Sequence, residues 1–287
     1  MSSATELARR LESGEIITFD PCPFALPAHD DHAFLLAQEL NAGKDINYNP
    51  HTRAVAGHVI QSDAATSRLA MLMEAFSTSA TSWLRTLLPA YAGAWQLDRV
   101  SLRTEEEATR TLRLTARNDL LHFDAFPSRP TQGHRILRLY VNIHPTDERI
   151  WTTSETFAKV LEKYGAAVGL PGIYADTILH RVGQKLLGIF QPTEQTRTEY
   201  DGFMLRLHHF MKLNEEFQEH APRKLLRFKA GSAWLLFADA ISHAELRGQF
   251  ALEHSFFIAP ESLALPDQSP AALLERVSRA VPPSQAA

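Results

Sequence analysis

A histidine and an aspartate stand two residues apart in the largely apolar segment Leu120–Pro127. Side chains at positions i and i+2 of a β-strand point to the same face, so a strand here would place His122 beside Asp124 and turn Phe123 away. Such a pair supplies two ligands of the 2-His-1-carboxylate arrangement, which binds Fe(II) and leaves positions open for a cosubstrate and oxygen. We therefore predict a metal site, with His243 as the best candidate for the third ligand.

The pair alone leaves other interpretations open. A partly buried histidine that is satisfied by a neighbouring carboxylate needs no metal. Zn(II) also binds histidine and carboxylate ligands with an activated water, so a hydrolase with the same ligands is a legitimate alternative. Arg138 favours the iron site, because a guanidinium in the middle of the apolar strand expected at 135–143 needs an anion. The C5 carboxylate of 2-oxoglutarate would supply that anion through a bidentate pair.

Three other histidines are weaker candidates. His254 follows His243 at a distance where jelly-roll oxygenases often place a side chain that binds the cosubstrate. It is a candidate hydrogen-bond partner, and a histidine of the hydrophobic core is an equal alternative. His208 and His209 are expected on a partly exposed helix face among charged residues.

Periodicity predicts where the strands and helices lie. Apolar residues at helical spacing indicate helices at 30–40, 62–88, 154–164, 174–187, 200–220 and 270–280. Thr152, followed by Glu155, is a candidate capping box for the third of these helices. Residues 44–50 are expected to form a loop. Alternating or continuous apolar runs indicate strands at 100–102, 112–114, 120–126, 135–143, 225–228, 233–237, 245–250 and 252–259.

The order of these elements predicts an α+β, mainly β fold. Strands in two blocks without βαβ alternation favour a double-stranded β-helix, that is, a jelly-roll or cupin-like core with helices packed outside and a helical insert. We expect a single domain over residues 1–287. Its expected parts are an N-terminal helical part (1–94), jelly-roll strands (95–150 and 225–260), a helical insert (151–224) and a C-terminal tail (261–287).

Composition narrows the functional classes. The net charge of −4 gives no reason to expect a nucleic acid as partner. No apolar run approaches the length of a membrane span, and the N-terminus lacks the features of a signal peptide. Cys22 is the one cysteine, so no intramolecular disulfide can form. We expect a cytoplasmic protein, and the sequence does not set its oligomeric state.

Longer strings of residues make the prediction more specific. These strings are Lys44–Tyr48, Ser101–Arg103, Arg117–Pro127, Arg135–Arg138, Tyr200–Leu205, Met211–Lys212, Gly231–Trp234, Ser242–Ala244 and Gly248–Glu253. In them the chain resembles the bacterial Kdo 3-hydroxylases, which are Fe(II)- and 2-oxoglutarate-dependent enzymes that act on the Kdo sugar of the lipopolysaccharide inner core.

The resemblance implies a jelly roll with iron on His122, Asp124 and His243, with 2-oxoglutarate and O2 as cosubstrates. It further implies that the product is the 3-hydroxylated sugar Ko and that ascorbate serves as the reductant in vitro. The chain departs from the family pattern at Thr104, at Arg247 and at His254. These departures affect the contacts to cosubstrate and sugar but not the iron ligands. Arg247 and His254 are therefore kept beside Arg138 as candidates for binding the cosubstrate.

The acceptor is expected to be Kdo in the lipid-linked inner core. Arg103, Arg117 and Arg129 lie near the predicted iron pair and suit a substrate that carries carboxylate and phosphate groups. The cations of the helical insert are suited to peripheral contact with the cytoplasmic face of the inner membrane, although a solvated helix face explains them equally well. Two alternatives remain. The protein could hydroxylate another sugar acid, or it could be a non-catalytic metal- or sugar-binding jelly roll.

Overall fold

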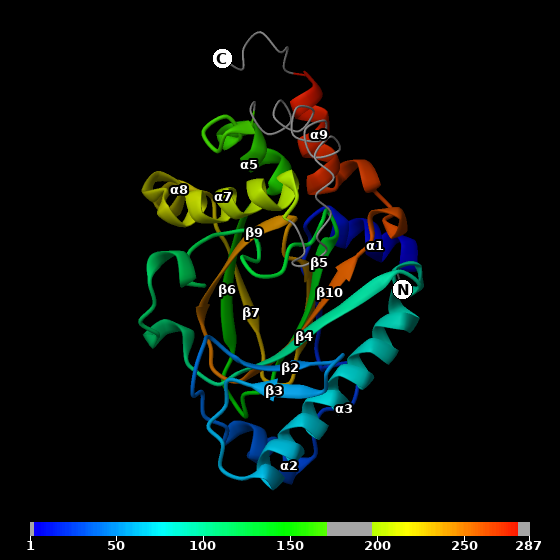
Figure 1. Ribbon diagram of the computed structural model, residues 1–287, viewed down its shortest axis with the longest axis vertical. Coiled ribbons are helices and arrows are strands. Elements are labelled where there is room, and N and C mark those ends of the chain that lie inside the picture. Colours follow the sequence, from blue (N-terminus) through cyan, green and yellow to red (C-terminus); the bar gives the residue numbers. More distant parts are fainter. Residues whose placement is uncertain (1–2, 171–196, 281–287) are drawn as a thin grey trace, which may run out of the picture.

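The computed structural model describes residues 3–170 and 197–280, and these form two antiparallel β-sheets with helices outside them (Figure 1). The larger sheet has the strand order β1-β8-β5-β10-β4-β2-β3, and the smaller sheet has the order β7-β6-β9. The strands are β1 (Ile17–Phe19), β2 (Ile46–Asn49), β3 (Ala54–Ala56), β4 (Trp95–Arg103), β5 (Arg135–Asn142), β6 (Arg149–Thr156), β7 (Lys224–Phe228), β8 (Ala233–Phe237), β9 (Ile241–Arg247) and β10 (Ala251–Ile258). The predicted jelly-roll core with outer helices is confirmed.

Helices cover the outside of the sheets in two groups. The long helix α3 runs beside β4, β2 and β3, whereas α5, α7, α8 and α9 gather beyond the end of β9 (Figure 1). The helices are α1 (Ala4–Glu12), α2 (His29–Leu36), α3 (Asp63–Leu87), α4 (Pro89–Ala92), α5 (Phe157–Tyr164), α7 (Glu199–Leu213), α8 (Glu215–His220) and α9 (Pro270–Ala280). Short 3₁₀ turns occur at Glu107–Thr109, Leu114–Ala116, Pro260–Ser262 and Pro266–Gln268.

Strand β5 is buried on both faces, and five of its eight residues are apolar. Leu137 and Leu139 face the core that the large sheet shares with α1, α2 and α3. Ile136 and Tyr140 face the opposite way, into the space between the two sheets, where they meet Trp151 of β6. Because side chains alternate along a strand, the intervening Arg138 also points between the sheets.

A separate hydrophobic cluster lies under the second group of helices. Phe203, Leu207 and Met211 of α7 pack there against Leu121 and Phe123. The apolar neighbours of the predicted metal ligands therefore anchor the ligand segment to α7. This packing turns His122 and Asp124 in the opposite direction, as the two-residue period requires.

Several local predictions need correction. Residues 112–114 form no strand, because this segment lacks a partner strand, and a short 3₁₀ turn begins at Leu114 instead. The expected loop at 44–50 contains β2, which pairs with β3 and β4. The insert predicted at 151–224 begins within β6, so Thr152 pairs with β7 and β9 and caps no helix. The helix expected at 174–187 lies outside the described residues.

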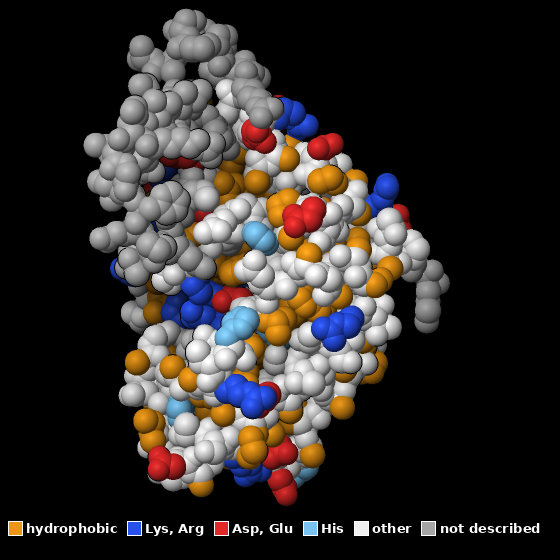
Figure 2. Space-filling model, turned by 45° about the vertical axis from the view of Figure 1, so that its right-hand side comes forward, with side chains coloured by type: hydrophobic (Ala, Val, Ile, Leu, Met, Phe, Trp, Pro, Cys, Tyr) orange, Lys and Arg blue, Asp and Glu red, His pale blue; other side chains and the backbone are white. Residues whose placement is uncertain are grey.

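Charged and apolar side chains are intermixed on the face shown in Figure 2, with a group of basic side chains at the left at mid-height and other basic side chains scattered over the face. None of the helices within residues 3–170 and 197–280 has both the length and the apolar character needed to cross a bilayer.

Candidate active site

Three side chains converge as the sequence predicts. His122, Asp124 and His243 are buried, and each offers one ligand atom within 4.8 Å of the other two. The Nε2 of His122 lies 3.5 Å from Oδ1 of Asp124, and the Nε2 of His243 lies 4.0 Å from the same oxygen. These separations match a set of two imidazoles and one carboxylate around a single metal ion.

Backbone hydrogen bonds hold the two histidines together. The amide of His122 donates to the carbonyl of His243 at 3.0 Å, and the amide of His243 donates back at the same distance. This pair is an isolated bridge, because residues 120–126 form no longer strand. The next link is the amide of Asp124, which donates to the carbonyl of Ala238. The extended ligand segment is therefore attached to β9 at one residue and to the end of β8 at another.

The histidine rings are oriented for metal binding. The Nδ1 of His122 lies 2.7 Å from the carbonyl oxygen of Leu120, and the Nδ1 of His243 lies 3.1 Å from that of Ile241. A proton on each Nδ1 satisfies these contacts and leaves the Nε2 lone pairs facing each other and Asp124. Burial lowers the pKa of both histidines, so the neutral form that a metal requires is favoured.

Asp124 is kept ionised by an arginine. Burial alone would raise the pKa of Asp124, but the charge of Arg138 and the contact with His122 hold it well below its usual range. The Nε of Arg138 lies 2.7 Å from Oδ2 of Asp124. Oδ1 is thus directed to the two histidines while Oδ2 faces the guanidinium. The donor set fits a divalent cation, because its two neutral imidazoles and one carboxylate converge without any proton between them.

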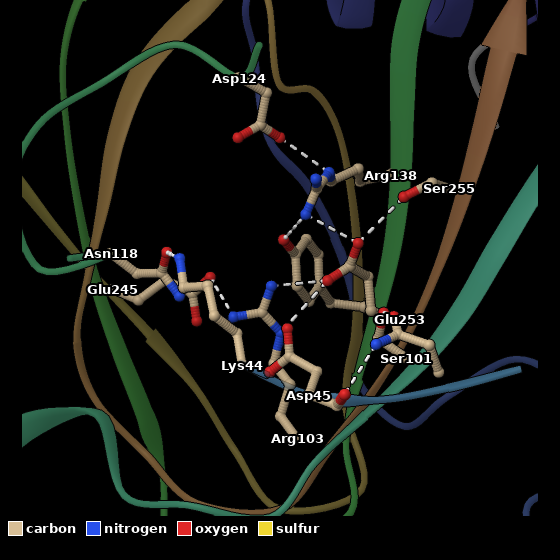
Figure 3. A network of polar contacts seen from close by, with 12 residues as sticks. Lys44, Asp45, Ser101, Arg103, Asn118, Asp124, Arg138, Glu245, Glu253 and Ser255 are labelled. Carbon is tan, nitrogen blue, oxygen red and sulfur yellow. Dashed lines mark hydrogen bonds and ion pairs between the residues drawn. The ribbon is translucent and has the colours of Figure 1, made fainter. Parts of the chain in front are cut away.

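Arg138 belongs to a larger ionic network between the sheets (Figure 3). Its Nη1 lies 2.7 Å from Glu253 and donates to the hydroxyl of Tyr140 at 2.9 Å. Arg103 belongs to the same network, because its Nη2 lies 2.7 Å from Glu253 and its Nη1 lies 2.8 Å from Glu245. Burial would raise the pKa of Glu253, but the two arginines lower it to about 2. The carboxylates of β9 and β10 therefore neutralise much of the charge of both arginines.

The metal site borders a cavity of about 400 Å³. Residues of β4, β5, β9 and β10, the ligand segment, α7 and the loop before β2 line it. The lining contains more cations than carboxylates. The cations are Lys44, Arg99, Arg103, Arg113, Arg129, Arg138 and Lys212, and the carboxylates are Asp45, Asp124, Glu245 and Glu253. The cavity is thus suited to anionic ligands.

The structure separates the three arginines that the sequence suggested for substrate. Arg103 lines the cavity but is paired with buried carboxylates. Arg129 lines the rim and pairs with Asp98. Arg117 does not line the cavity, because it turns toward Asp119 at the surface, so its assignment as a substrate contact does not fit this structure.

Two predicted cosubstrate residues also lie elsewhere. His254 is opposite Leu139 in the pairing of β10 with β5, so it faces the outer core rather than the cavity. There its Nε2 lies 2.9 Å from the hydroxyl of Ser77 on α3. Arg247 is exposed at the end of β9 and is not part of the cavity lining. For both residues, strand alternation and position place the side chain away from the cosubstrate.

The sequence analysis assigned no role at the site to several residues of the cavity wall, among them His208, Lys212 and Lys44. His208 lies on α7, and its ring packs edge-on against that of His122 at 5.1 Å between centroids. Lys212 stands one turn further along α7, and Lys44 precedes β2. The i, i+4 spacing of His208 and Lys212 puts them on one helix face. Only the folded structure shows that this face meets the cavity.

Comparison with known proteins agrees with the geometry. A family model described as 3-deoxy-D-manno-oct-2-ulosonic acid (Kdo) hydroxylase matches residues 1–281. The chain is similar to the apo structure of the Kdo hydroxylase KdoO, a non-haem Fe(II) α-ketoglutarate dependent dioxygenase. The TM-score is 0.83, with 31% identity over 96% of this chain and 90% of that chain. The complex of KdoO with α-ketoglutarate and Fe(III) gives a TM-score of 0.82, 31% identity and the same coverage. A search of curated proteins found no match.

The family match extends over both strand blocks and over the segment between them, and therefore includes all three converging side chains. The structural match to KdoO is equally extensive. The resemblance inferred from the strings of residues is thus confirmed. This chain belongs to the Kdo hydroxylase family.

Proposed function

We propose that the protein hydroxylates C3 of Kdo, with Fe(II) held by Nε2 of His122, Oδ1 of Asp124 and Nε2 of His243. The observation that carries this proposal is the convergence of these three atoms on a cationic cavity. When bound, Fe(II) and 2-oxoglutarate supply the oxidation, in which one atom of O2 enters the sugar and the other enters succinate as carbon dioxide is released. The similar structure of KdoO in complex with α-ketoglutarate and Fe(III) supports the same cofactors for this protein.

The protein residues position the reactants and exclude water. Arg138 is proposed to bind the distal carboxylate of 2-oxoglutarate, because it is the cation nearest to Asp124 and lines the cavity. The hydroxyl of Tyr140 fixes the guanidinium at 2.9 Å, which limits its freedom. The ring of His208 packs against that of His122 and covers one side of the iron ligand.

The acceptor is proposed to be lipid-linked rather than a free acid. A second hollow, along β2 and β3, shares Asp45, Arg99 and Arg129 with the edge of the cavity. It provides room for an acceptor that extends beyond one sugar. A lipid-linked acceptor also motivates a proposed peripheral contact with the cytoplasmic face of the inner membrane, for which Lys159, Lys163 and Arg206 are candidate cations.

The test offers free Kdo and Kdo-lipid A separately to the protein with Fe(II), ascorbate and 2-oxoglutarate. Succinate and a gain of one oxygen on the sugar are measured together, and mass spectrometry locates the oxygen. We expect coupled turnover of Kdo-lipid A. Efficient turnover of free Kdo with none on the lipid-linked form would rule out the lipid-linked acceptor. Succinate release with hydroxylation of neither acceptor would identify another sugar acid as the substrate.

A further inference from the structure

We propose that Lys44 and Lys212 together form the subsite that binds the carboxylate of the acceptor sugar. This assignment rests on the proposed function, because it takes Kdo as the acceptor. The two lysines are the residues that we assign to orienting the sugar at the metal. They take the place of the arginines that the sequence analysis suggested for substrate binding.

The two lysines reach the cavity from different parts of the chain. Lys212 is 4% exposed on α7, and its ammonium has only a long contact of 3.4 Å with the carbonyl oxygen of Thr115. Lys44 precedes β2 and donates to the side-chain oxygen of Asn118 at 2.8 Å. Both line the cavity beside the metal ligands. Within the described ranges, neither ammonium is within ion-pair distance of a carboxylate.

Among the described cations that line the cavity, the two lysines share this lack of ion pairs with Arg99 and Arg113, and Lys212 is the buried member of these four. Arg103 and Arg138 are each held by buried carboxylates, and Arg129 is held by Asp98. Buried cations without a counter-ion are costly, and that cost is offset when an anion binds. Accordingly, burial and the charge of Lys44 lower the pKa of Lys212 to about 7. The lysines therefore have the capacity to bind an anion that the protein itself does not supply.

The chemistry of the acceptor matches this arrangement. In a 3-deoxy-2-ulosonic acid, the carboxylate is attached to C2, the immediate neighbour of C3. A cation pair that holds the carboxylate beside the metal therefore also fixes the distance of C3 from the metal. Lys212 meets this requirement, since it lines the same cavity one turn after His208 on α7, and the ring of His208 packs against that of His122 at 5.1 Å between centroids.

The other anion of the reaction, 2-oxoglutarate, is the main competitor for this subsite. The position of the lysines favours the acceptor. Arg138 and Arg103 lie between the sheets, where a cosubstrate would be enclosed, whereas Lys44 is partly exposed and Lys212 belongs to the helical wall. Both lysines thus line a different part of the cavity wall from the one that Arg138 and Arg103 form between the sheets.

The experiment uses protein that has been loaded with Fe(II) and 2-oxoglutarate under anaerobic conditions. It compares the binding of two ligands to this protein, the methyl glycoside of Kdo and the neutral methyl ester of that glycoside. Calorimetry measures the affinity of the unmodified protein, of Lys44→Met and of Lys212→Met for the glycoside and for its ester. Each substitution should weaken binding of the acid by about tenfold or more, because a charge-assisted contact is lost. Binding of the ester and of 2-oxoglutarate should not change. Lys229→Met is the matched control, because Lys229 pairs with Asp20 at the surface.

Thermal unfolding distinguishes recognition from a structural role. Removing an uncompensated buried charge should leave the ligand-free Lys212→Met protein as stable as the unmodified protein or more stable. A loss of stability together with unchanged binding of the acid would overturn the proposal. So would a weakened affinity for 2-oxoglutarate with normal binding of the glycoside, and Lys44→Met gives an independent answer if Lys212→Met fails to fold. If the unmodified protein binds no methyl glycoside, the same variants are compared on Kdo-lipid A and its carboxyl methyl ester. Turnover of Kdo-lipid A by the unmodified protein tests the proposed function separately, so unchanged binding of the acid by both variants would overturn the subsite alone.

Discussion

The Nε of Arg138 lies 2.7 Å from Oδ2 of Asp124, so the carboxylate proposed to bind the metal and the arginine proposed to bind the cosubstrate are in direct contact. This contact leaves Oδ1 of Asp124 for the metal and fixes the orientation of the carboxylate. Outer partners of this kind set the geometry and basicity of metal ligands. It follows that substitutions at Arg138 affect two properties, the affinity for 2-oxoglutarate and the arrangement of the metal ligands.

The first prediction concerns the metal ligands. His122→Ala, Asp124→Ala and His243→Ala should each abolish coupled turnover, because two remaining ligands hold Fe(II) too weakly. Iron content after anaerobic loading and succinate release are measured on the same preparations. His220→Ala serves as control, since His220 is exposed at the end of α8. Normal succinate release by the His243→Ala protein would move the third ligand to another residue.

The second prediction concerns the cosubstrate. Arg138→Met should raise the apparent requirement for 2-oxoglutarate at least tens-fold, because losing a charge-assisted pair at a desolvated site costs roughly 2–5 kcal/mol. Iron content is measured in parallel, since the same guanidinium contacts Asp124. Arg117→Met is the matched control, because Arg117 pairs with Asp119 outside the cavity. An unchanged requirement in an iron-loaded variant would make Arg103 the better candidate.

The third prediction is a pH dependence that follows from Lys212. Burial and the charge of Lys44 lower its pKa from 10.5 to about 7, against the opposing charges of Asp124, Asp119 and Glu245. Because the charged form binds an anion, the apparent KM for the acidic acceptor should increase as the pH rises through about 7. The steepest possible increase of this KM is about tenfold per pH unit, because a single proton is lost. His208 should not contribute to this change, because burial lowers its pKa to about 4.

The same group affects stability in a defined direction. Between pH 7 and 10.5 the unfolded chain binds a proton at Lys212 that the ligand-free folded protein releases. Stability should therefore rise with pH across this window. Acceptor KM and denaturant unfolding are measured as functions of pH. Lys212→Met should remove both dependences, and a variant that retains the full KM profile would contradict the assignment to this lysine.

The fourth prediction concerns the glycine after β9. Gly248 has a φ of +139°, and a Cβ there would lie 2.5 Å from Cγ of Arg149. Arg149 is fully buried and contacts Glu245 at 2.6 Å. Gly248→Ala should lower the free energy of unfolding by about 2–4 kcal/mol through steric overlap and backbone strain. Gly169→Ala, at a φ of +89° with open space around it, should cost less in the same denaturation experiment.

The sequence was sufficient for features that depend on local periodicity. The two-residue repeat placed His122 and Asp124 on one face, and helical spacing identified α3 almost to the residue. It failed where an element depends on a partner, as at 112–114, where alternation is present but no strand lies alongside. The jelly roll was predictable from the order of the strands, because βαβ alternation is absent.

The charge state of the cavity could not be predicted from the sequence. Arg103, Glu245 and Glu253 belong to β4, β9 and β10, and only the fold shows that they neutralise one another. His254 and Glu253 are adjacent in sequence but face opposite sides of β10, so the register decides which of them meets the cavity. Lys212 stands in one of the strings that carry the family resemblance, but its place in the cavity could not be predicted because a lysine on a helix is normally solvated.

The reciprocal backbone bridge between His122 and His243 has a consequence for biosynthesis. On the ribosome, the first two ligands emerge long before the third, and the strand that carries His243 is among the last to be made. A nascent chain therefore has no complete metal centre, and a product truncated before β9 cannot acquire one. In the proposed site, iron could therefore bind only after β9 has been made, and bound iron would report that β9 and the segment of His122 have come together.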